Sequence, residues 1–349
     1  MRIAGVASAF PRHYFKQEEV AEELKSYWSG QLDHPAVLTR MLSRVGVEGR
    51  HFVQPLDQYK GMDTWGKSND AWIEHAEELA EQSLCKAMTR AGLELDTLGA
   101  IFFVSVTGIC SPSIDARLIN RMKLPRDIKR VPIFGLGCVA GAAGIARAAD
   151  YVKAYPKDVA AVVSVELCSL TWQREDVSVA NLISSGLFGD GAACAVVAGS
   201  EVHSTGPQVL ATRSSFYPDT EEMMGWKISE KGFRIVLSPK VPELVLERLA
   251  KDVDEFLDDN GLQRRDISSW IMHTGGPKIL EATEAALDLK NGELKASWEC
   301  LKKVGNLSSA SVLVVLEEHY TNRRPEPGTY SLLAAMGPGF CAELLLLKW

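Results

Sequence analysis

The sequence lacks the closely spaced cysteine and histidine pairs that mark metal sites. Its seven cysteines are scattered without a CxxC pair, and its seven histidines form no HxxxH or HxH pair. Zinc sites and redox motifs use such spacings, and small disulfide-stabilised folds need many paired cysteines in a short chain. We therefore expect no metal site and no disulfide framework.

Excess positive charge and long apolar runs are also missing. The net charge is −7, whereas nucleic-acid-binding proteins carry a basic face. No apolar run approaches the roughly 18–20 residues that span a membrane. The first residues, Met1–Val6, resemble a strand and lack the charged and hydrophobic regions of a secretory signal. We expect a cytoplasmic protein that neither binds nucleic acid nor spans a membrane.

The two halves of the chain repeat one order of patterns. With 349 residues, of which 46% are hydrophobic, the chain can bury a large core in one or two domains. In the first half, an amphipathic helix at 74–91 precedes a strand at 100–104. In the second half, a helix at 244–260 precedes a strand at 270–272, and both helices end at a Gly-Leu pair. The recurrence indicates a duplicated unit.

Each half continues with a helix of small residues and a pair of apolar strands. The helices are expected at 139–153 and 307–320, and the strands at 159–165 with 191–198 and at 329–335 with 340–347. Strands that alternate with helices predict a mainly parallel sheet covered on both faces. The predicted fold is a duplicated α/β fold of two stacked halves, 1–205 and 206–349, in five layers ordered αβαβα.

Cys138 lies where an apolar strand meets a helix rich in glycine and alanine. At the first turn of that helix, a thiol is close to the positive end of the helix dipole and to several unpaired N–H groups. Both favour the thiolate, which is the nucleophilic form of cysteine. The alternative interpretation is a small hydrophobic residue in a tight core.

His273 and Asn306 occupy matching junctions in the second half. His273 ends a strand and precedes Thr274-Gly275-Gly276-Pro277, and Asn306 stands at the start of the second small-residue helix. The alternatives are a buried core histidine and a helix N-cap asparagine. Because corresponding junctions of a duplicated fold converge at its centre, we expect Cys138, His273 and Asn306 to meet there.

Five short motifs occur in order through both halves. They are Gly137-Cys138-Val139-Ala140-Gly141, Leu187-Phe188-Gly189-Asp190-Gly191-Ala192-Ala193, His273-Thr274-Gly275-Gly276-Pro277, Gly305-Asn306-Leu307-Ser308-Ser309-Ala310 and Gly337-Pro338-Gly339-Phe340. With them the chain resembles the thiolase-fold condensing enzymes, and among these the type III polyketide synthases related to chalcone and stilbene synthases. The Gly-Pro-Gly motif separates it from ketoacyl synthases that use acyl carrier proteins. The Cys-His-Asn set separates it from thiolases, which have a second catalytic cysteine.

The resemblance implies a reaction between coenzyme A thioesters without a further cofactor. Cys138, paired with protonated His273, would accept a starter acyl group from an acyl-CoA. His273 and Asn306 would then stabilise the enolate that forms when malonyl-CoA loses carbon dioxide. The carbanion attacks the acyl-cysteine, the chain grows by two carbons, and rounds repeat before ring closure. The resemblance also implies a homodimer, in which the segment Cys110–Ser113 reaches across the interface.

The resemblance assigns further residues to the cavity, its entrance and the substrate. Phe188 matches an aromatic gatekeeper, with ordinary core packing as the alternative, and Ile235 replaces a second gatekeeper phenylalanine, which suggests a wider entrance. Arg40 and Arg44, four apart on a predicted helix face, match residues that bind coenzyme A phosphates, with a solvated face as the alternative. The predicted cavity residues are Thr107, Cys110, Cys168, Thr171, Trp226 and Ser308. Gly275 and Gly276 are further predicted coenzyme A contacts, and Gly337, Pro338 and Gly339 form the predicted cyclisation loop.

The product class depends on the shape of the cavity. Ile235 and motifs like those of bacterial members favour an alkylpyrone or alkylresorcinol made from a long-chain fatty acyl-CoA. The alternative is a malonyl-primed enzyme that makes a small polyhydroxylated aromatic, since Cys110 and Cys168 also give the cavity a polar character. A cysteine hydrolase that cleaves thioesters would use the same Cys-His pair. A catalytically silent acyl-CoA-binding protein is disfavoured because all three reactive positions are filled.

Overall fold

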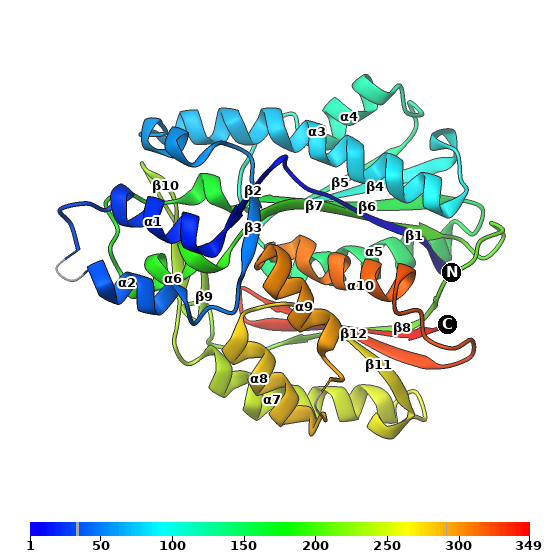
Figure 1. Ribbon diagram of the computed structural model, residues 1–349. Coiled ribbons are helices and arrows are strands. Elements are labelled where there is room, and N and C mark those ends of the chain that lie inside the picture. Colours follow the sequence, from blue (N-terminus) through cyan, green and yellow to red (C-terminus); the bar gives the residue numbers. More distant parts are fainter. Residues whose placement is uncertain (33–34, 291) are drawn as a thin grey trace.

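The computed structural model describes residues 1–32, 35–290 and 292–349, and it stacks them in five alternating layers of helix and sheet (Figure 1). The outer layer above is α3 (Trp65–Ala91) with α4 (Ile114–Met122), and the outer layer below is α7 (Val241–Asp258) with α8 (Pro277–Leu287). The central layer holds α5 (Ala140–Ala154) and α10 (Ser311–Thr321) between two groups of strands. The predicted five-layer αβαβα fold is confirmed.

The strands form one nine-stranded sheet in the order β11-β12-β13-β8-β1-β7-β6-β4-β5. The upper group is β1 (Arg2–Ala9), β4 (Leu98–Val104), β5 (Lys129–Ile133), β6 (Val159–Leu167) and β7 (Asp190–Ala198). The lower group is β8 (Gln208–Phe216), β11 (Ile267–Met272), β12 (Tyr330–Gly337) and β13 (Cys341–Lys348). One pair, Arg2 with Gln208, links the two groups. The proposed division of the chain at residues 205 and 206 stays a prediction.

The prediction of a mainly parallel sheet is wrong. Strand β4 is parallel to β5 and β6, and β11 is parallel to β12, but β7 is antiparallel to β1 and β6, and β13 is antiparallel to β8 and β12. Helices cover both faces of each group, so antiparallel strands are as continuously apolar here as buried parallel strands are. The apolar runs therefore did not reveal strand direction.

Several shorter elements surround the layers. The helices are α1 (Gln17–Tyr27), α2 (Pro35–Leu42), α6 (Val179–Leu187) and α9 (Lys295–Val304). Two separate hairpin sheets pair β2 (His13–Lys16) with β3 (Gly49–Phe52) and β9 (Met224–Ser229) with β10 (Gly232–Leu237). In the described residues, no helix is both long enough and apolar enough to cross a lipid bilayer.

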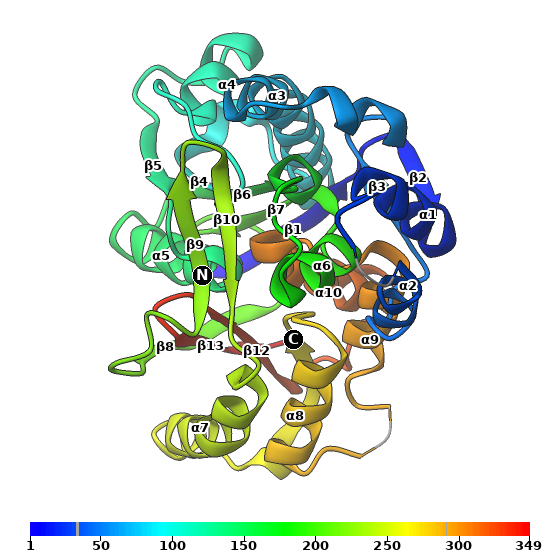
Figure 2. The ribbon, with the colours of Figure 1, turned by 90° about the vertical axis from the view of Figure 1, so that its left-hand side faces the viewer.

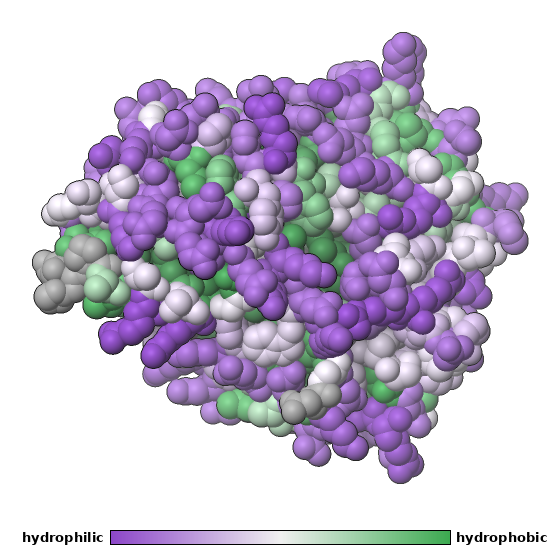
Figure 3. All heavy atoms as spheres, viewed as in Figure 1, coloured by the Kyte–Doolittle hydropathy of each residue, from purple (hydrophilic) through white to green (hydrophobic). Residues whose placement is uncertain are grey.

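The small-residue helices lie where the molecule is most tightly packed. A side chain at Gly141 in α5 would come 2.1 Å from the carbonyl oxygen of Ser309, just before α10. Glycine and alanine therefore allow the two central helices to approach each other closely. The face shown in Figure 3 is covered mainly by polar side chains, with small apolar areas scattered among them. This packing fixes the positions of Cys138 and Asn306, which precede the two helices.

Candidate active site

The three predicted catalytic residues line one small, mainly apolar cavity. Cys138 lies in the 3-10 turn before α5, His273 directly follows β11, and Asn306 lies between α9 and α10. All three are at least nine-tenths buried. Phe188 and Gly275 line the same cavity, which has a volume of about 30 Å³. The structure therefore brings the three junctions together, as the duplicated pattern predicts.

The predicted cyclisation loop packs directly against the turn of Cys138. A side chain at Gly137, whose φ is +55°, would come 2.6 Å from the ring of Pro338. A side chain at Gly337 would come 2.7 Å from the carbonyl oxygen of Leu136. Glycine is needed at both places because no larger residue fits. The Gly-Pro-Gly turn between β12 and β13 thus holds the turn of Cys138 in position.

Ser308 connects Cys138 to Asn306. The Cys138 thiol donates to the Ser308 hydroxyl at 3.6 Å, and the Ser308 backbone N–H donates to Asn306 Oδ1 at 2.8 Å. The Ser311 hydroxyl donates to the same oxygen at 3.3 Å. With its oxygen engaged in this way, the Asn306 amide has its Nδ2 group left to donate into the cavity.

The backbone of Asn306 is fixed against the gatekeeper segment. Its N–H donates to the Leu187 carbonyl at 3.0 Å, and its carbonyl accepts from the Gly189 N–H at 3.0 Å. These bonds form a parallel bridge between Asn306 and Phe188. These hydrogen bonds therefore tie the predicted gatekeeper to the predicted oxyanion donor.

Burial keeps the thiol and the imidazole neutral in this closed cavity. It raises the pKa of Cys138 to about 12, with the hydrogen bond to Ser308 opposing the rise, and it lowers the pKa of His273 to about 4. The sequence predicts a thiolate favoured by the helix start and paired with a protonated histidine. Desolvation is the largest cause of both shifts, and the ion pair stays a prediction.

Glu166 is a site residue that the sequence analysis missed. Its buried carboxyl accepts from Thr107 Oγ1 at 2.8 Å, from the Val106 N–H at 3.1 Å and from the Ser309 hydroxyl. Burial raises the pKa of Glu166 to about 7. The available signal was a single charged residue in the otherwise uncharged strand at 159–167. Through Ser309, Glu166 ties β6 to the turn that carries Asn306.

Arg50 and Asp190 support the gatekeeper segment from behind. The Arg50 guanidinium is fully buried and donates to the Phe188 carbonyl at 3.2 Å. Burial lowers the pKa of Arg50 to about 9, and Asp190 opposes this shift. Asp190 accepts from the backbone N–H of Val53 at 2.9 Å and of Ser169 at 2.8 Å. Asp190 lies within one of the five sequence motifs. Arg50 lies in none of them, and an arginine in a strand gives no sign in the sequence that its side chain is buried.

A second, larger cavity borders the β9–β10 hairpin, as the first does, since Phe233 lines one and Leu237 the other. It has a volume of about 570 Å³ and is lined by Thr107, Thr171, Phe233 and many polar or charged side chains. Two of the predicted cavity residues, Thr107 and Thr171, thus belong to this outer cavity. Cys168 is buried, and burial, Glu166, Asp190 and Cys138 all raise its pKa.

The β9–β10 hairpin faces both cavities. Met224 and Leu237 are directly opposite each other and line the catalytic cavity, and Phe233 lines the outer cavity. Trp226 and Ile235 are opposite each other two residues further along, and they lie on the same face between the two cavities' lining residues, because alternate residues of a strand point the same way. Ile235 is therefore placed at the boundary between the two cavities.

The structure places two other sets of predicted residues away from the catalytic cavity. Cys110 lies in a separate surface pocket with Pro112 and Phe134, outside the catalytic cavity of its own chain, and its role as a cavity residue stays a prediction. Helix α2 ends at Leu42, so Arg40 and Arg44 do not share a helix face, although both are exposed.

The two glycines predicted to contact coenzyme A, Gly275 and Gly276, differ in their positions. Gly275 lines the catalytic cavity, and its N–H donates to the His273 carbonyl at 3.0 Å. Gly276 begins α8 with φ of +128°, a conformation that favours glycine. Both therefore shape the backbone after His273, and contact with coenzyme A stays a prediction.

The five-layer fold is that of the thiolase-like condensing enzymes, and the predicted catalytic residues Cys138, His273 and Asn306 meet in one of its cavities. Two family models cover almost the whole chain: "FAE1/Type III polyketide synthase-like protein" matches residues 11–209, and "Chalcone and stilbene synthases, C-terminal domain" matches 208–349. The chain belongs to the type III polyketide synthases, the chalcone and stilbene synthase-like family.

Similar proteins agree with this assignment over their full length. A 1,3,6,8-tetrahydroxynaphthalene synthase of Streptomyces peucetius subsp. caesius is 47% identical, over 99% of this chain and 93% of the relative. A phloroglucinol synthase of Pseudomonas fluorescens is 31% identical, over 97% of each chain. The crystal structure of 1,3,6,8-tetrahydroxynaphthalene synthase from Streptomyces coelicolor A3(2) superposes with a TM-score of 0.95, at 32% identity, over 100% of this chain and 99% of that one. The predicted family and acyltransferase class are confirmed, and such enzymes need no cofactor beyond their coenzyme A thioester substrates.

Proposed function

We propose that this enzyme uses malonyl-CoA both as starter and as extender and makes a small polyhydroxylated aromatic of the tetrahydroxynaphthalene class. The 47% identity to a tetrahydroxynaphthalene synthase along almost the whole chain carries this proposal. It replaces the long-chain product that Ile235 favoured in the sequence. The outer cavity supports the change, because it is lined by polar side chains such as Thr171 and Ser68, which suit a chain of ketone oxygens better than an alkyl tail.

In the proposed loading step, the Cys138 thiol attacks the thioester carbonyl. The neutral His273 imidazole accepts the thiol proton as the carbon–sulfur bond forms, and it returns that proton to the departing coenzyme A thiolate. Because burial lowers the pKa of His273, the imidazole enters this step neutral, with a ring nitrogen that can take up the proton as the carbon–sulfur bond forms. Proton transfer within the cavity thus replaces a permanent ion pair.

In the proposed extension step, Asn306 and His273 act as donors. Their N–H groups hold the thioester oxygen of malonyl-CoA, and this oxygen gains negative charge as carbon dioxide leaves. The resulting carbanion attacks the acyl thioester on Cys138, whose sulfur departs as thiolate. The extended chain, now on coenzyme A, returns to Cys138 for the next round.

The volumes of the cavities indicate where the growing chain goes. The catalytic cavity of about 30 Å³ has room for about one or two water molecules. A polyketide of several units therefore cannot remain there unless side chains move. The outer cavity of about 570 Å³ can hold the distal end of the chain. We assign Thr107 and Thr171 to contacts with that distal end.

The experiment that tests this function supplies malonyl-CoA as the only substrate. We expect carbon dioxide release and an aromatic product made only of malonyl-derived units, identified by liquid chromatography and mass spectrometry. The Cys138→Ala variant is the control and makes no such product. If products form only when a long-chain acyl-CoA is added, the malonyl-primed assignment is wrong and the long-chain product class is restored.

We also propose a homodimer that pairs through the edge of the upper strand group. Strand β5 is the last strand of the sheet, and beside it Phe134 and Ile109 are 46% and 47% exposed. The predicted interface segment Cys110–Ser113 lines the same surface pocket. Burying such an apolar area stabilises association. Light scattering should give the mass of two chains for the wild type and of one chain for Phe134→Glu; a monomeric wild type contradicts the proposal.

A further inference from the structure

The β9–β10 hairpin stands apart from the main sheet. Its strands pair with each other and form a separate two-stranded sheet, without ladder hydrogen bonds to the nine-stranded sheet. Figure 2 shows it crossing the molecule from the level of α7 towards α3 and α4. An isolated hairpin is only marginally stable by itself, so its position depends on contacts with neighbouring segments.

One face of the hairpin forms a wall that both cavities share. Leu237 lines the catalytic cavity, Phe233 lines the outer cavity, and Ile235 lies between them on the same strand. A shift of this strand would change both cavities together. The position of the hairpin therefore sets the space available to a chain that grows from Cys138.

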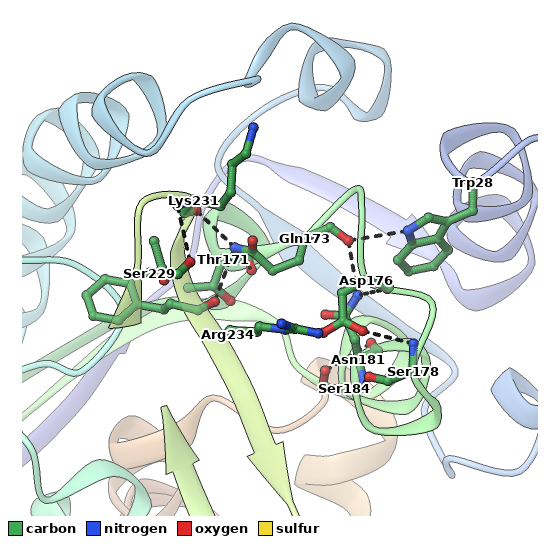
Figure 4. A network of polar contacts seen from close by, with 12 residues as sticks. Trp28, Thr171, Gln173, Asp176, Ser178, Asn181, Ser184, Ser229, Lys231 and Arg234 are labelled. Atoms are coloured by element: carbon green, nitrogen blue, oxygen red, sulfur yellow. Dashed lines mark hydrogen bonds and ion pairs between the residues drawn. The ribbon is translucent and has the colours of Figure 1, made fainter. Parts of the chain in front are cut away.

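The same strand carries a polar attachment, through the Arg234 side chain on its other face and through backbone carbonyls (Figure 4). Arg234 Nε donates to Asp176 Oδ2 at 3.0 Å, and the Asp176 side chain is only 8% exposed. Gln173 Nε2 donates to the carbonyl oxygens of Lys231 and Phe233, each at 3.2 Å. These contacts join the tip and the second strand of the hairpin to the segment 173–176, which precedes α6.

That segment is itself firmly held. The Gln173 carbonyl accepts from Trp28 Nε1 at 3.3 Å and from Asn181 Nδ2 at 3.1 Å. The second carboxylate oxygen of Asp176 accepts from the Ser178 N–H at 2.9 Å. The hairpin is thus attached through Arg234 to a fixed acceptor that is anchored on α1 and α6.

We propose that Gln173, Asp176 and Arg234 form a latch that fixes the hairpin wall and thereby determines how far the polyketide grows before it is released. This inference rests on the proposed malonyl-primed function. The three are positioning residues, since they act on the cavity through Phe233, Ile235 and Leu237. When the latch is weakened, the hairpin shifts, and the cavities no longer hold the polyketide chain extended. A short chain then cyclises early, as its enol oxygen attacks its own thioester carbonyl and expels the sulfur to give a lactone.

The hairpin itself offers a matched control for this proposal. Lys227 is directly opposite Arg234, and its ion pair with Glu222, at 3.4 Å, joins two exposed side chains within the 222–227 region. Arg234→Gln and Lys227→Gln each remove one positive charge from the same face of the hairpin. Only the first removes a contact with the segment 173–176.

The test compares products from malonyl-CoA in the wild type, Arg234→Gln, Lys227→Gln and Arg234→Lys. In Arg234→Gln we expect the ratio of main product to lactones to fall about threefold or more. The free energy of a partly exposed ion pair is large enough for a change of this size. Malonyl-CoA consumption should stay within about twofold of the wild type, because Cys138, His273 and Asn306 are unchanged. Arg234→Lys should restore part of the ratio, and Lys227→Gln should match the wild type.

Salt provides a second measurement on the unaltered enzyme. Raising the ionic strength from about 0.05 M to about 1 M screens the half-exposed Arg234 and should shift wild-type products towards those of Arg234→Gln. The same salt change should leave the products of Arg234→Gln almost unchanged. Equal product ratios in Arg234→Gln and Lys227→Gln would overturn the latch, whereas absence of malonyl-derived products from the wild type would overturn the proposed function instead.

Discussion

Replacing Asn306 by aspartate should separate starter loading from decarboxylation. The carboxylate of Asn306→Asp keeps the acceptor oxygen that the Ser308 N–H and the Ser311 hydroxyl contact at 2.8 and 3.3 Å. The turn that places Ser308 beside Cys138 is therefore retained. What changes is the donor: an N–H group aimed at the enolate becomes an oxygen with negative charge.

The expected loss follows from the role of that donor. Removing one oxyanion-hole donor lowers kcat by about 10²–10³, equivalent to about 2.7–4 kcal/mol. The negative charge of aspartate repels the enolate, so decarboxylation in Asn306→Asp should fall by at least this factor. Loading does not use the donor and should fall by less than about tenfold. Ser311→Ala keeps the donor but removes one contact to Oδ1 and the acceptor of the Leu307 N–H at 2.7 Å, so it should lower the free energy of unfolding by about 1–3 kcal/mol and slow decarboxylation less than Asn306→Asp does.

Two assays measure the two half-reactions on each variant. Intact-protein mass spectrometry with acetyl-CoA follows acyl transfer to Cys138, and formation of acetyl-CoA from malonyl-CoA follows decarboxylation. We expect a loaded but decarboxylation-deficient enzyme for Asn306→Asp. Equal losses in both assays, or normal decarboxylation by the aspartate variant, would refute the assignment of Asn306 as an enolate donor.

Three further predictions address the thiol and the wall. Cys138→Ala should lose the acyl adduct; an adduct that persists, for instance on Cys168, would reassign the nucleophile. Since burial raises the pKa of Cys138 to about 12, alkylation by iodoacetamide should keep accelerating up to about pH 10 instead of levelling off near the usual thiol pKa of about 8.5. A plateau below neutral pH would show a thiolate–imidazolium pair in the free enzyme. Ile235→Phe adds bulk between the cavities, and overpacking of this kind typically costs about 1–3 kcal/mol. The variant should therefore lower kcat/KM for long acyl-CoA starters more than for short ones. An unchanged ratio of the two kcat/KM values would place Ile235 outside the path of the acyl chain.

Much of the fold, and the meeting of Cys138, His273 and Asn306 in one cavity, could be predicted from the sequence because they depend on local patterns. Strand ends, small-residue helices and glycine turns are read within a few residues, and the repetition of these patterns placed Cys138, His273 and Asn306 at equivalent junctions. Convergence of those junctions is a property of the duplicated fold, so no side-chain detail was needed.

Properties that depend on tertiary packing could not be predicted. Helix α2 ends at Leu42, shortly before Gly46, whose φ is +73°. Arg40 therefore lies in the helix and Arg44 lies beyond its end. The ionisation of Cys138 depends on how completely the cavity closes, which no local pattern records. Glu166 and Arg50 have roles only because distant segments surround them.

The central claim is that every carbon unit of the product, the first one included, comes from malonyl-CoA. Malonyl-CoA labelled with ¹³C at its methylene carbon, supplied with an excess of unlabelled acetyl-CoA and a long-chain acyl-CoA, tests this directly by mass spectrometry of the product. Our account predicts a label in every two-carbon unit. A product whose first unit is unlabelled, or which carries an alkyl chain from the added acyl-CoA, would contradict it.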